Sequence, residues 1–327
     1  MAQAAARIEP FLAVRRLSPP APTGYSRPMR SKRKPRWALA LSGGGAKGIA
    51  HIGVLKVLEA MGMPPPSLIV GTSMGAIVGG LYACGMSAAE LERFVLDDFD
   101  IRKYLDGFAF PASGNPFAKL IRTGQALGNL ATRPGIDSGN KVLEVLEKLS
   151  GGASFDRTRI PFLCNAADLA SGEEVILSEG SVAKAIRASM AFPAFFDPVG
   201  YGDRLLADGG LVDNLPVRLA REAGFSRVLA VDVFGIRRVK PETFKTVPVI
   251  VYRAFEIATA RMDRDAVDRA TLTLHADDGT SPFDFARARR LVALGEAAAR
   301  ERTRELGLFF ESGPIAAIRR MLGKQGG

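Results

Sequence analysis

The chain is poor in the residues that most often build redox, metal and histidine-dependent sites. Its 327 residues include only two cysteines, two histidines and one tryptophan. Cys84 and Cys164 lie in apolar stretches, and neither has partners at metal-ligand spacing. This pattern excludes a disulfide framework and a cysteine-based metal site. We expect reduced core cysteines in a cytoplasmic protein, and no metal or cofactor in its reaction.

Charged side chains are absent from a stretch of 30 residues between Glu59 and Glu90. Its length would allow a membrane span, but three consecutive prolines (64–66) and six glycines interrupt it. Because proline breaks a helix interior, the stretch predicts a buried strand, a turn and a helix. The small residues 75–79 would let that helix pack closely on a sheet.

Positive charge is concentrated at the start of the chain. Residues 1–36 contain nine Lys or Arg against one acidic residue, Glu9, whereas the other 291 residues carry a net charge of only +2. This segment also holds six prolines and no helical or strand period. We expect a disordered, solvated extension, with contact to anionic lipid as the functional alternative. The even charge of the remainder argues against nucleic-acid binding.

From Trp37 onward, apolar runs and helical periods alternate. Strands are predicted at 37–41, 67–70, 160–167, 204–207, 227–233 and 271–274, and helices at 47–61, 91–99, 141–149, 181–190, 216–223 and 284–306. Such alternation predicts an α/β fold of three layers, with a mainly parallel central sheet flanked by helices. Residues 37–306 form one expected domain, followed by a helical tail at 307–327. The irregular stretch 100–136 is a candidate cover over a site.

A glycine-rich loop, Gly43-Gly44-Gly45-Ala46-Lys47-Gly48, follows the first strand and opens the first helix. The spacing matches a dinucleotide-binding loop. That site also needs an acidic residue after the second strand to hold a ribose, and none lies in the uncharged stretch. The loop therefore presents backbone N–H groups to some other negative charge, such as the oxyanion of a tetrahedral intermediate.

A serine lies between two glycines directly after the second strand, in the sequence Gly71-Thr72-Ser73-Met74-Gly75. In a G-x-S-x-G turn, a strand bends sharply into a helix, and the glycines relieve crowding so that the serine projects into a cleft. A buried structural serine would explain the hydroxyl but not both glycines. Ser73 is therefore the candidate nucleophile.

A serine nucleophile needs a base, and the sequence offers several candidates. Asp208 ends the apolar run 204–207 and precedes two glycines, at a position where α/β sheets place reactive groups. His275 would complete the chain order Ser, Asp, His of a catalytic triad. His51 lies in the first helix and can at most be a neighbour, while Asp232 remains a further candidate.

Together, the glycine-rich loop, G-T-S-M-G and D-G-G resemble the patatin-like phospholipase family. The resemblance extends from about Trp37 to Glu301 and includes the stretches 51–55, 167–173, 188–193 and 213–217. It is closest to bacterial members related to the catalytic domain of neuropathy target esterase. Ser42 stands where many relatives have aspartate.

This resemblance implies a Ser–Asp dyad without histidine, in which Ser73 is the nucleophile and Asp208 the general base. It places Gly43, Gly44, Gly45, Lys47 and Gly48 around the oxyanion, with Lys47 orienting the loop or meeting a substrate phosphate. The implied reaction is hydrolysis of phospholipid or lysophospholipid acyl esters through an acyl-enzyme.

Apolar side chains outside the predicted core extend this expectation. Irregular segments carry Phe108, Phe110, Phe117, Phe192, Phe195 and Phe196. They suit either acyl-chain binding or satellite core packing. Residues 315–322 form an amphipathic pattern that favours docking on the protein body, with a lipid surface as the alternative. A cytoplasmic location is therefore expected, with peripheral contact with a membrane as the alternative, and the oligomeric state is left open.

Overall fold

The computed structural model describes residues 36–100, 135–238, 240–243 and 247–311. Its centre is an eight-stranded sheet in the order β10-β9-β1-β2-β4-β8-β7, with β5 also paired to β4. The strands are β1 (Ala38–Leu41), β2 (Leu68–Gly71), β4 (Phe162–Asp168), β5 (Glu174–Leu177), β7 (Val199–Tyr201), β8 (Arg204–Asp208), β9 (Val228–Asp232) and β10 (Leu272–His275). A small second sheet pairs β3 (Gly135–Asp137) with β6 (Ala194–Phe196).

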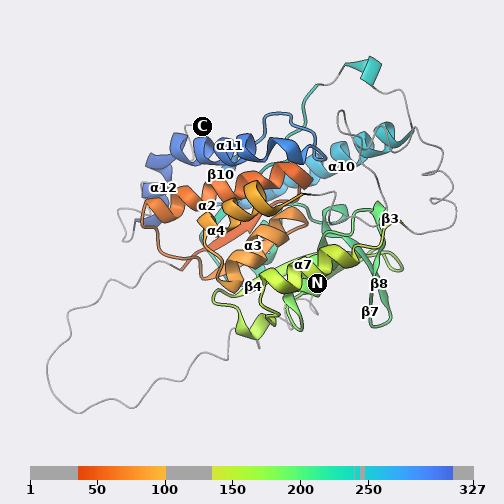
Figure 1. Cartoon of the computed structure of the whole chain (residues 1–327). Helices are drawn as coiled ribbons and strands as arrows, with labels where there is room; N and C mark the ends of the chain where they lie inside the picture. The colour runs from red at the N-terminus through yellow and green to blue at the C-terminus, as the bar shows by residue number, and fades with distance from the viewer. Residues whose placement is uncertain (1–35, 101–134, 239, 244–246, 312–327) are drawn as a thin grey trace, which may run out of the picture.

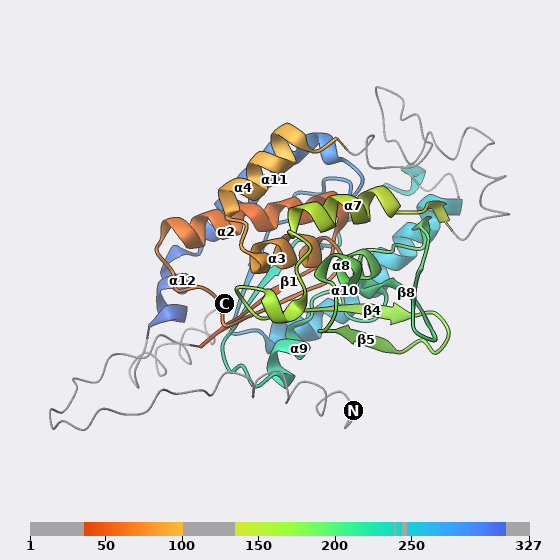
Figure 2. The same cartoon turned by 60° about the horizontal axis from the view of Figure 1, so that its bottom comes forward.

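Helices cover both faces of the large sheet (Figures 1 and 2). One face carries α2 (Ala50–Ala60), α3 (Met74–Cys84), α4 (Ala88–Arg93), α7 (Asn140–Leu149), α8 (Val182–Ser189) and α11 (Ala288–Glu301). The other carries α9 (Val217–Glu222) and part of α10 (Val247–Arg269). This arrangement confirms the predicted three-layer α/β fold.

The period of two along the buried strands explains why both faces are covered. In β1, Leu39 and Leu41 join the larger core, whereas Ala38 and Ala40 point into the smaller one. Alternate side chains of a strand point to opposite faces of the sheet. A strand that is apolar at every position is therefore stable only when helices pack on both sides.

The sheet is parallel on one side and antiparallel on the other. Strands β10, β9, β1, β2 and β4 run parallel, whereas β5 and β8 run antiparallel to β4. β5 pairs with residues 164–167 of β4 and occupies one edge of that strand. Consequently β2, which ends at Gly71 opposite Cys164, and β8, which ends at Asp208 opposite Ala166, share the other edge.

The helical boundaries differ from the sequence predictions in three places. The capping box of Ser87 and Glu90 is present, but the helix it starts changes after Arg93 into a π-helical turn over Phe94–Asp98. The helix expected over 284–306 divides at Arg302 into α11 and α12 (Thr303–Phe310). The 23-residue helix α10 was not predicted at all.

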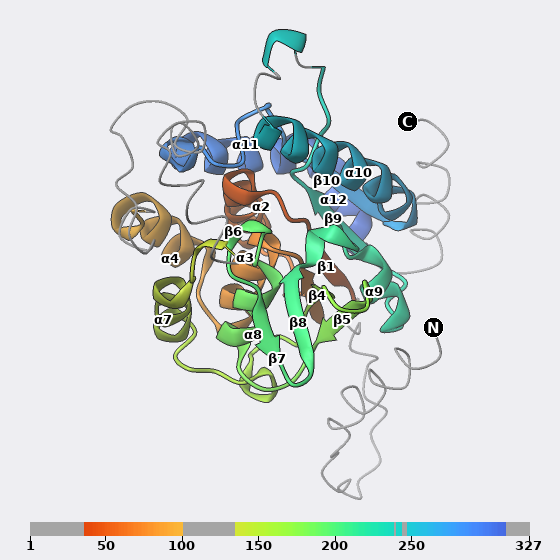
Figure 3. The same cartoon turned by 90° about the vertical axis from the view of Figure 1, so that its right-hand side faces the viewer.

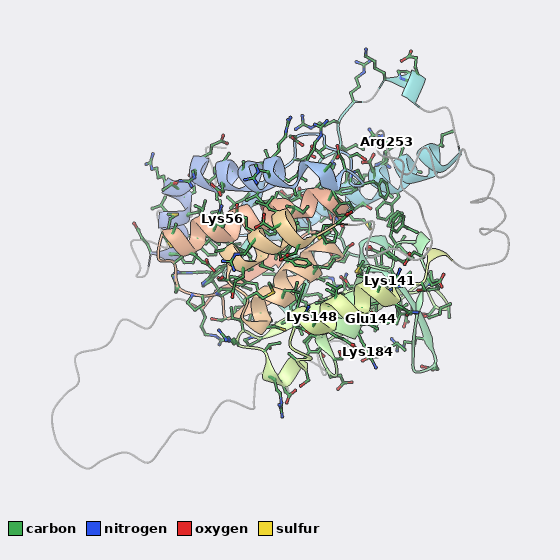
Figure 4. All side chains as sticks on the ribbon, in the orientation of Figure 1. Lys56, Lys141, Glu144, Lys148, Lys184 and Arg253 are labelled. Atoms are coloured by element: carbon green, nitrogen blue, oxygen red, sulfur yellow. The ribbon has the colours of Figure 1, made fainter. Side chains whose placement is uncertain are left out.

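Helix α7 shows how the amphipathic helices sit on the body. Its apolar side chains Val142, Val145, Leu146 and Leu149 face an internal pocket, whereas Lys141, Glu144 and Lys148 are carried on its outer side (Figure 4).

Within the described ranges, no helix combines the length and apolar character needed to cross a bilayer. The expected N-terminal extension, most of the candidate cover at 100–136 and the amphipathic pattern at 315–322 lie outside the described residues.

Candidate active site

Ser73 occupies a sharp turn between β2 and α3. Its backbone has φ 52° and ψ −117°, and it is the one non-glycine residue with positive φ in the described part of the chain. The flanking glycines explain how the turn is possible. A Cβ atom at Gly71 would lie 2.5 Å from the Gly75 carbonyl oxygen, and one at Gly75 would lie 2.3 Å from that of Leu41. Backbone strain of this kind is commonly found at functional sites.

The Ser73 hydroxyl donates a hydrogen bond to Asp208, with 2.7 Å between Oγ and Oδ2. The other carboxylate oxygen of Asp208 accepts from the Gly210 N–H at 2.8 Å. Asp208 is only 3% exposed. Burial raises the pKa of its carboxyl to about 6, although the hydrogen bonds from Gly210 and Ser73 act in the opposite direction. This carboxylate can therefore accept a proton near neutral pH more readily than an exposed aspartate.

The glycine-rich loop crosses the site beside Ser73. Gly44 and Gly45, both of which line the pocket with Ser73, lie at the start of a short 3-10 helix, η1 (Gly45–Ile49), where N–H groups have no intrahelical acceptor. The Gly43 N–H instead donates to the Asn214 carbonyl at 3.1 Å. A Cβ at Gly48 would meet Met74 Cγ at 2.4 Å, so this glycine allows close packing on α3.

Lys47, which belongs to this loop, has a buried side chain. Its Nζ lies 3.1 Å from Asp277 Oδ1 and 5.5 Å from the centre of the Phe234 ring. Only 4% of the residue is exposed. Of the two roles expected from the sequence, this pairing supports orientation of the loop rather than contact with a substrate phosphate.

The two histidines take other partners. His275 ends β10 at the edge of the sheet, three strands from β2, and its Nδ1 lies 3.2 Å from Asp232 Oδ2. His51 Nε2 donates to the Ser42 carbonyl oxygen at 2.8 Å, and burial lowers the pKa of its imidazole to about 4. Of the candidate bases Asp208, His275 and Asp232, Asp208 is the one that the structure brings to Ser73.

The sequence of residues 39–221 matches the family model for patatin-like phospholipase. The chain belongs to the patatin-like phospholipase family. An uncharacterized NTE family protein of Mycobacterium bovis is 35% identical over 216 residues, covering 66% of this chain and 53% of that protein. Lysophospholipase NTE1 of Debaryomyces hansenii is 32% identical over 200 residues, covering 61% of this chain and 12% of that protein. The chain thus spans about half the length of its mycobacterial relatives and a small part of the yeast protein.

A solved structure, that of VipD from Legionella pneumophila, aligns with a TM-score of 0.45 and 17% identity. The alignment covers 82% of this chain and 66% of VipD.

Asn214 contacts both the glycine-rich loop and the turn that follows Asp208 in this patatin-like site. Its backbone carbonyl accepts the Gly43 N–H. Its side-chain oxygen lies so close to Gly43 and Gly210 that a Cβ there would meet it at 2.4 Å and 3.1 Å. Its Nδ2 donates to Asp263 Oδ2 at 2.8 Å. Asp263 lies on α10, and burial raises the pKa of its carboxyl to about 8.

The sequence interpretation missed this pair for a physical reason. Asn214 belongs to one of the stretches that carry the family resemblance, but its local sequence gives no sign of a partner 49 residues away. Asp263 lies in a helix that the hydrophobic pattern did not reveal. The contact of Ser189 was missed as well, because its local sequence gives no sign of a partner. Its hydroxyl oxygen accepts the Ser73 N–H at 3.0 Å.

An apolar pocket begins at Ser73 and Asp208 and continues along α3. Met74, Ile77, Val78 and Leu81 form the α3 side of its wall, and helices α4 and α7 and several phenylalanines complete it. Of the six phenylalanines singled out in the sequence, Phe192, Phe195 and Phe196 line this pocket. Phe108, Phe110 and Phe117 lie outside the described residues. From Ser73 to Leu81 the helix rises about 12 Å, which suits an extended hydrocarbon chain.

Proposed function

We propose that the protein is a serine lipid acyl hydrolase that cleaves fatty-acyl esters of phospholipids or lysophospholipids. The observation that carries this proposal is the 2.7 Å hydrogen bond from Ser73 Oγ to Asp208 Oδ2 at the head of an apolar pocket. The family match and the lysophospholipase name of the yeast relative support the choice of substrate.

In the first half of the reaction, Asp208 accepts the hydroxyl proton while Ser73 Oγ forms a bond to the carbonyl carbon of the acyl ester. The negative charge on the carbonyl oxygen is stabilised by the N–H groups of Gly44 and Gly45. The ester C–O bond then breaks, and the departing alcohol takes the proton from Asp208. The acyl group remains bound to Ser73.

In the second half, water attacks the acyl carbon and gives a proton to Asp208. The bond between the acyl group and Ser73 Oγ breaks, the serine recovers the proton, and a fatty acid leaves. Every proton transfer uses the same carboxyl group, so the raised pKa of Asp208 matters in both halves. Gly43, whose N–H is already bound to Asn214, contributes by close packing, and Lys47 and Gly48 by fixing the loop.

A small soluble ester is the other substrate class for a serine esterase. The extended apolar wall along α3 favours a long acyl chain instead, because burial of each methylene contributes about 0.8 kcal/mol to binding.

The test is release of fatty acid from lysophosphatidylcholine, compared with p-nitrophenyl esters of graded chain length. We expect release by the native protein, rising with chain length, and none by Ser73→Ala. Equal release by Ser73→Ala would overturn the proposal, and a preference for acetate or butyrate esters would favour a soluble carboxylesterase. Lipid binding without any release would indicate a noncatalytic relative.

A further inference from the structure

Exposed large apolar side chains gather around one end of the sheet. In the described part of the chain, the members of this class are Leu169, Tyr201, Leu205, Ile236, Ile250, Ile257 and Met262. Six of them form two groups near the carboxyl ends of the parallel strands, the end at which Ser73 lies, whereas Met262 lies further along α10. Scattered apolar residues on a surface need no explanation, but this concentration does.

The first group, called the α10 cluster, consists of Ile236, Ile250 and Ile257, which are 40–50% exposed. Ile250 and Ile257 lie two turns apart on one side of α10. Ile236 lies in the loop after β9, and this loop is tied to α10 because Arg253 Nη2 donates to the Arg237 carbonyl at 2.6 Å. Arg253 projects from the N-terminal half of α10 (Figure 4).

The second group, called the hairpin cluster, consists of Leu169 and Leu205, with Tyr201 on the opposite face of the β7–β8 hairpin. β8 pairs with β4 through Asp168 and Leu206, and the Leu169 N–H continues the pairing by donating to Leu205 O at 2.8 Å. Leu169 therefore lies beyond the last residue of β4, at the carboxyl edge. The β7–β8 hairpin and α10 lie on opposite sides of this edge in Figure 3.

Both clusters belong to segments that also reach the apolar pocket. Phe234, two residues before Ile236, lines the pocket. So does Phe255, which lies on the inner side of α10, opposite the exposed Ile257. Their ring centres are 6.3 Å apart. On the other side, Asp208 follows Leu205 by three residues along β8. The head of the pocket, where Ser73 and Asp208 lie, is thus at the same end of the sheet as both clusters.

Positive charge accompanies the α10 cluster. The loop 234–240 contains Arg237, Arg238 and Lys240 and no acidic residue, and these three side chains are exposed. Arg237 pairs with Asp277 at 3.0 Å. Exposed apolar side chains next to cations are typical of proteins that lie on an anionic membrane, with the apolar groups at the boundary between headgroups and acyl chains.

We infer that the α10 cluster and the hairpin cluster form a docking surface for an anionic lipid bilayer, with the pocket opening toward the membrane. The inference rests on the proposed lipid hydrolase function. It specifies the orientation of the protein on its substrate and the lipid charge that it prefers. It also explains why these apolar side chains are exposed rather than buried.

The test is co-sedimentation of the full chain with vesicles of phosphatidylcholine alone or mixed with phosphatidylglycerol. The native chain is expected to bind the mixed vesicles more tightly, and added salt should weaken this binding. The double variant Ile250→Asp/Ile257→Asp and the single variant Leu205→Asp should each reduce binding at least about tenfold, because each substitution places a charge where an apolar side chain would be buried. Arg238→Glu should remove most of the preference for phosphatidylglycerol.

Met262→Asp is the matched control, since Met262 is an exposed apolar residue of the same helix outside both clusters. This variant should bind as the native chain does. Hydrolysis of p-nitrophenyl butyrate in solution should be unchanged in all of these variants. Intact ester hydrolysis with unaltered vesicle binding in the cluster variants would overturn the docking surface alone, whereas absence of ester hydrolysis in the native chain would count against the proposed function.

Self-association is measured in parallel by analytical ultracentrifugation without vesicles. A native dimer that Ile250→Asp/Ile257→Asp converts to monomers would assign the surface to a second copy of the chain and overturn the bilayer inference.

Discussion

Ser73 and Asp208 meet because the strands that precede them end two residues apart along the same edge of β4. Gly71, the last residue of β2, lies opposite Cys164, and Asp208, the last residue of β8, lies opposite Ala166. The two strands run in opposite directions, and their carboxyl ends meet beside β4. The hydrogen bond of 2.7 Å between the two side chains is thus built into the topology of the sheet.

Replacement of Asp208 by asparagine should remove the proton acceptor while preserving the shape of the site. We expect kcat to fall by about 10²- to 10⁴-fold. In the native enzyme, kcat/KM should fall below pH 6, because burial raises the pKa of the Asp208 carboxyl to about 6 and only the ionised form accepts the proton. A pH–rate profile with a fatty-acyl ester measures both effects. An acidic limb near pH 4 would contradict the assignment.

The same substitution should stabilise the protein above pH 6. The folded-state pKa of Asp208, about 6, is above the ordinary value of 3.8, so ionisation favours the unfolded state as pH rises from about 4 to 6. The shift corresponds to about 3 kcal/mol of unfolding free energy. Denaturant titrations should show that the unfolding free energy of Asp208→Asn increases relative to that of the native protein as pH rises across this window. At higher pH the difference between the two unfolding free energies should be constant. A difference that does not change with pH would argue against a buried, titrating carboxyl.

Gly45 should be essential for catalysis because of its position beside the site. A Cβ at Gly45 would lie 2.4 Å from the Pro282 carbonyl oxygen, and the residue has φ +56°. We expect Gly45→Ala to displace the oxyanion loop and to lower kcat by about 10²-fold or more. Gly62→Ala is the control, because Gly62 has a similar φ of +64° with nothing near its Cβ position. Equal losses in the two variants would indicate a general effect on stability.

Asp263 is expected to act as a positioning residue. Asp263→Ala leaves the buried Asn214 amide without its acceptor, so Asn214 should no longer hold Gly43 and Gly210 in place. We expect kcat to fall by about 10- to 10²-fold with little change in KM. Asp263→Asn should keep most of the activity, since the carboxyl has a pKa of about 8 and is mainly neutral at pH 7. Equal activity in the two variants would show that Asp263 does not act as a positioning residue.

The parts of the structure that depend on local sequence were predictable. The alternation of strands and helices, the capping box at Ser87 and the small-residue packing of α3 follow from neighbouring residues, and the structure shows all three. The residues of the glycine loop and of the G-x-S-x-G turn could likewise be singled out from their order in the chain.

The parts that depend on tertiary contacts were not predictable. Nothing in the sequence shows that β8 runs antiparallel to β4 and thereby brings Asp208 to Ser73. Helix α10 was missed because residues 247–258 are apolar around most of the helix and include Pro248. Because this helix was not predicted, two of its residues were not recognised: Phe255, which lines the pocket, and Asp263, which accepts a hydrogen bond from Asn214.

Covalent labelling by a fluorophosphonate, followed by peptide mapping, tests whether Ser73 is a nucleophile activated by Asp208. We expect the probe to modify Ser73, Asp208→Asn to slow the labelling strongly, and His275→Ala to leave its rate unchanged. Modification of another residue would show that Ser73 is not the nucleophile, and loss of labelling in His275→Ala together with normal labelling in Asp208→Asn would assign the base to His275.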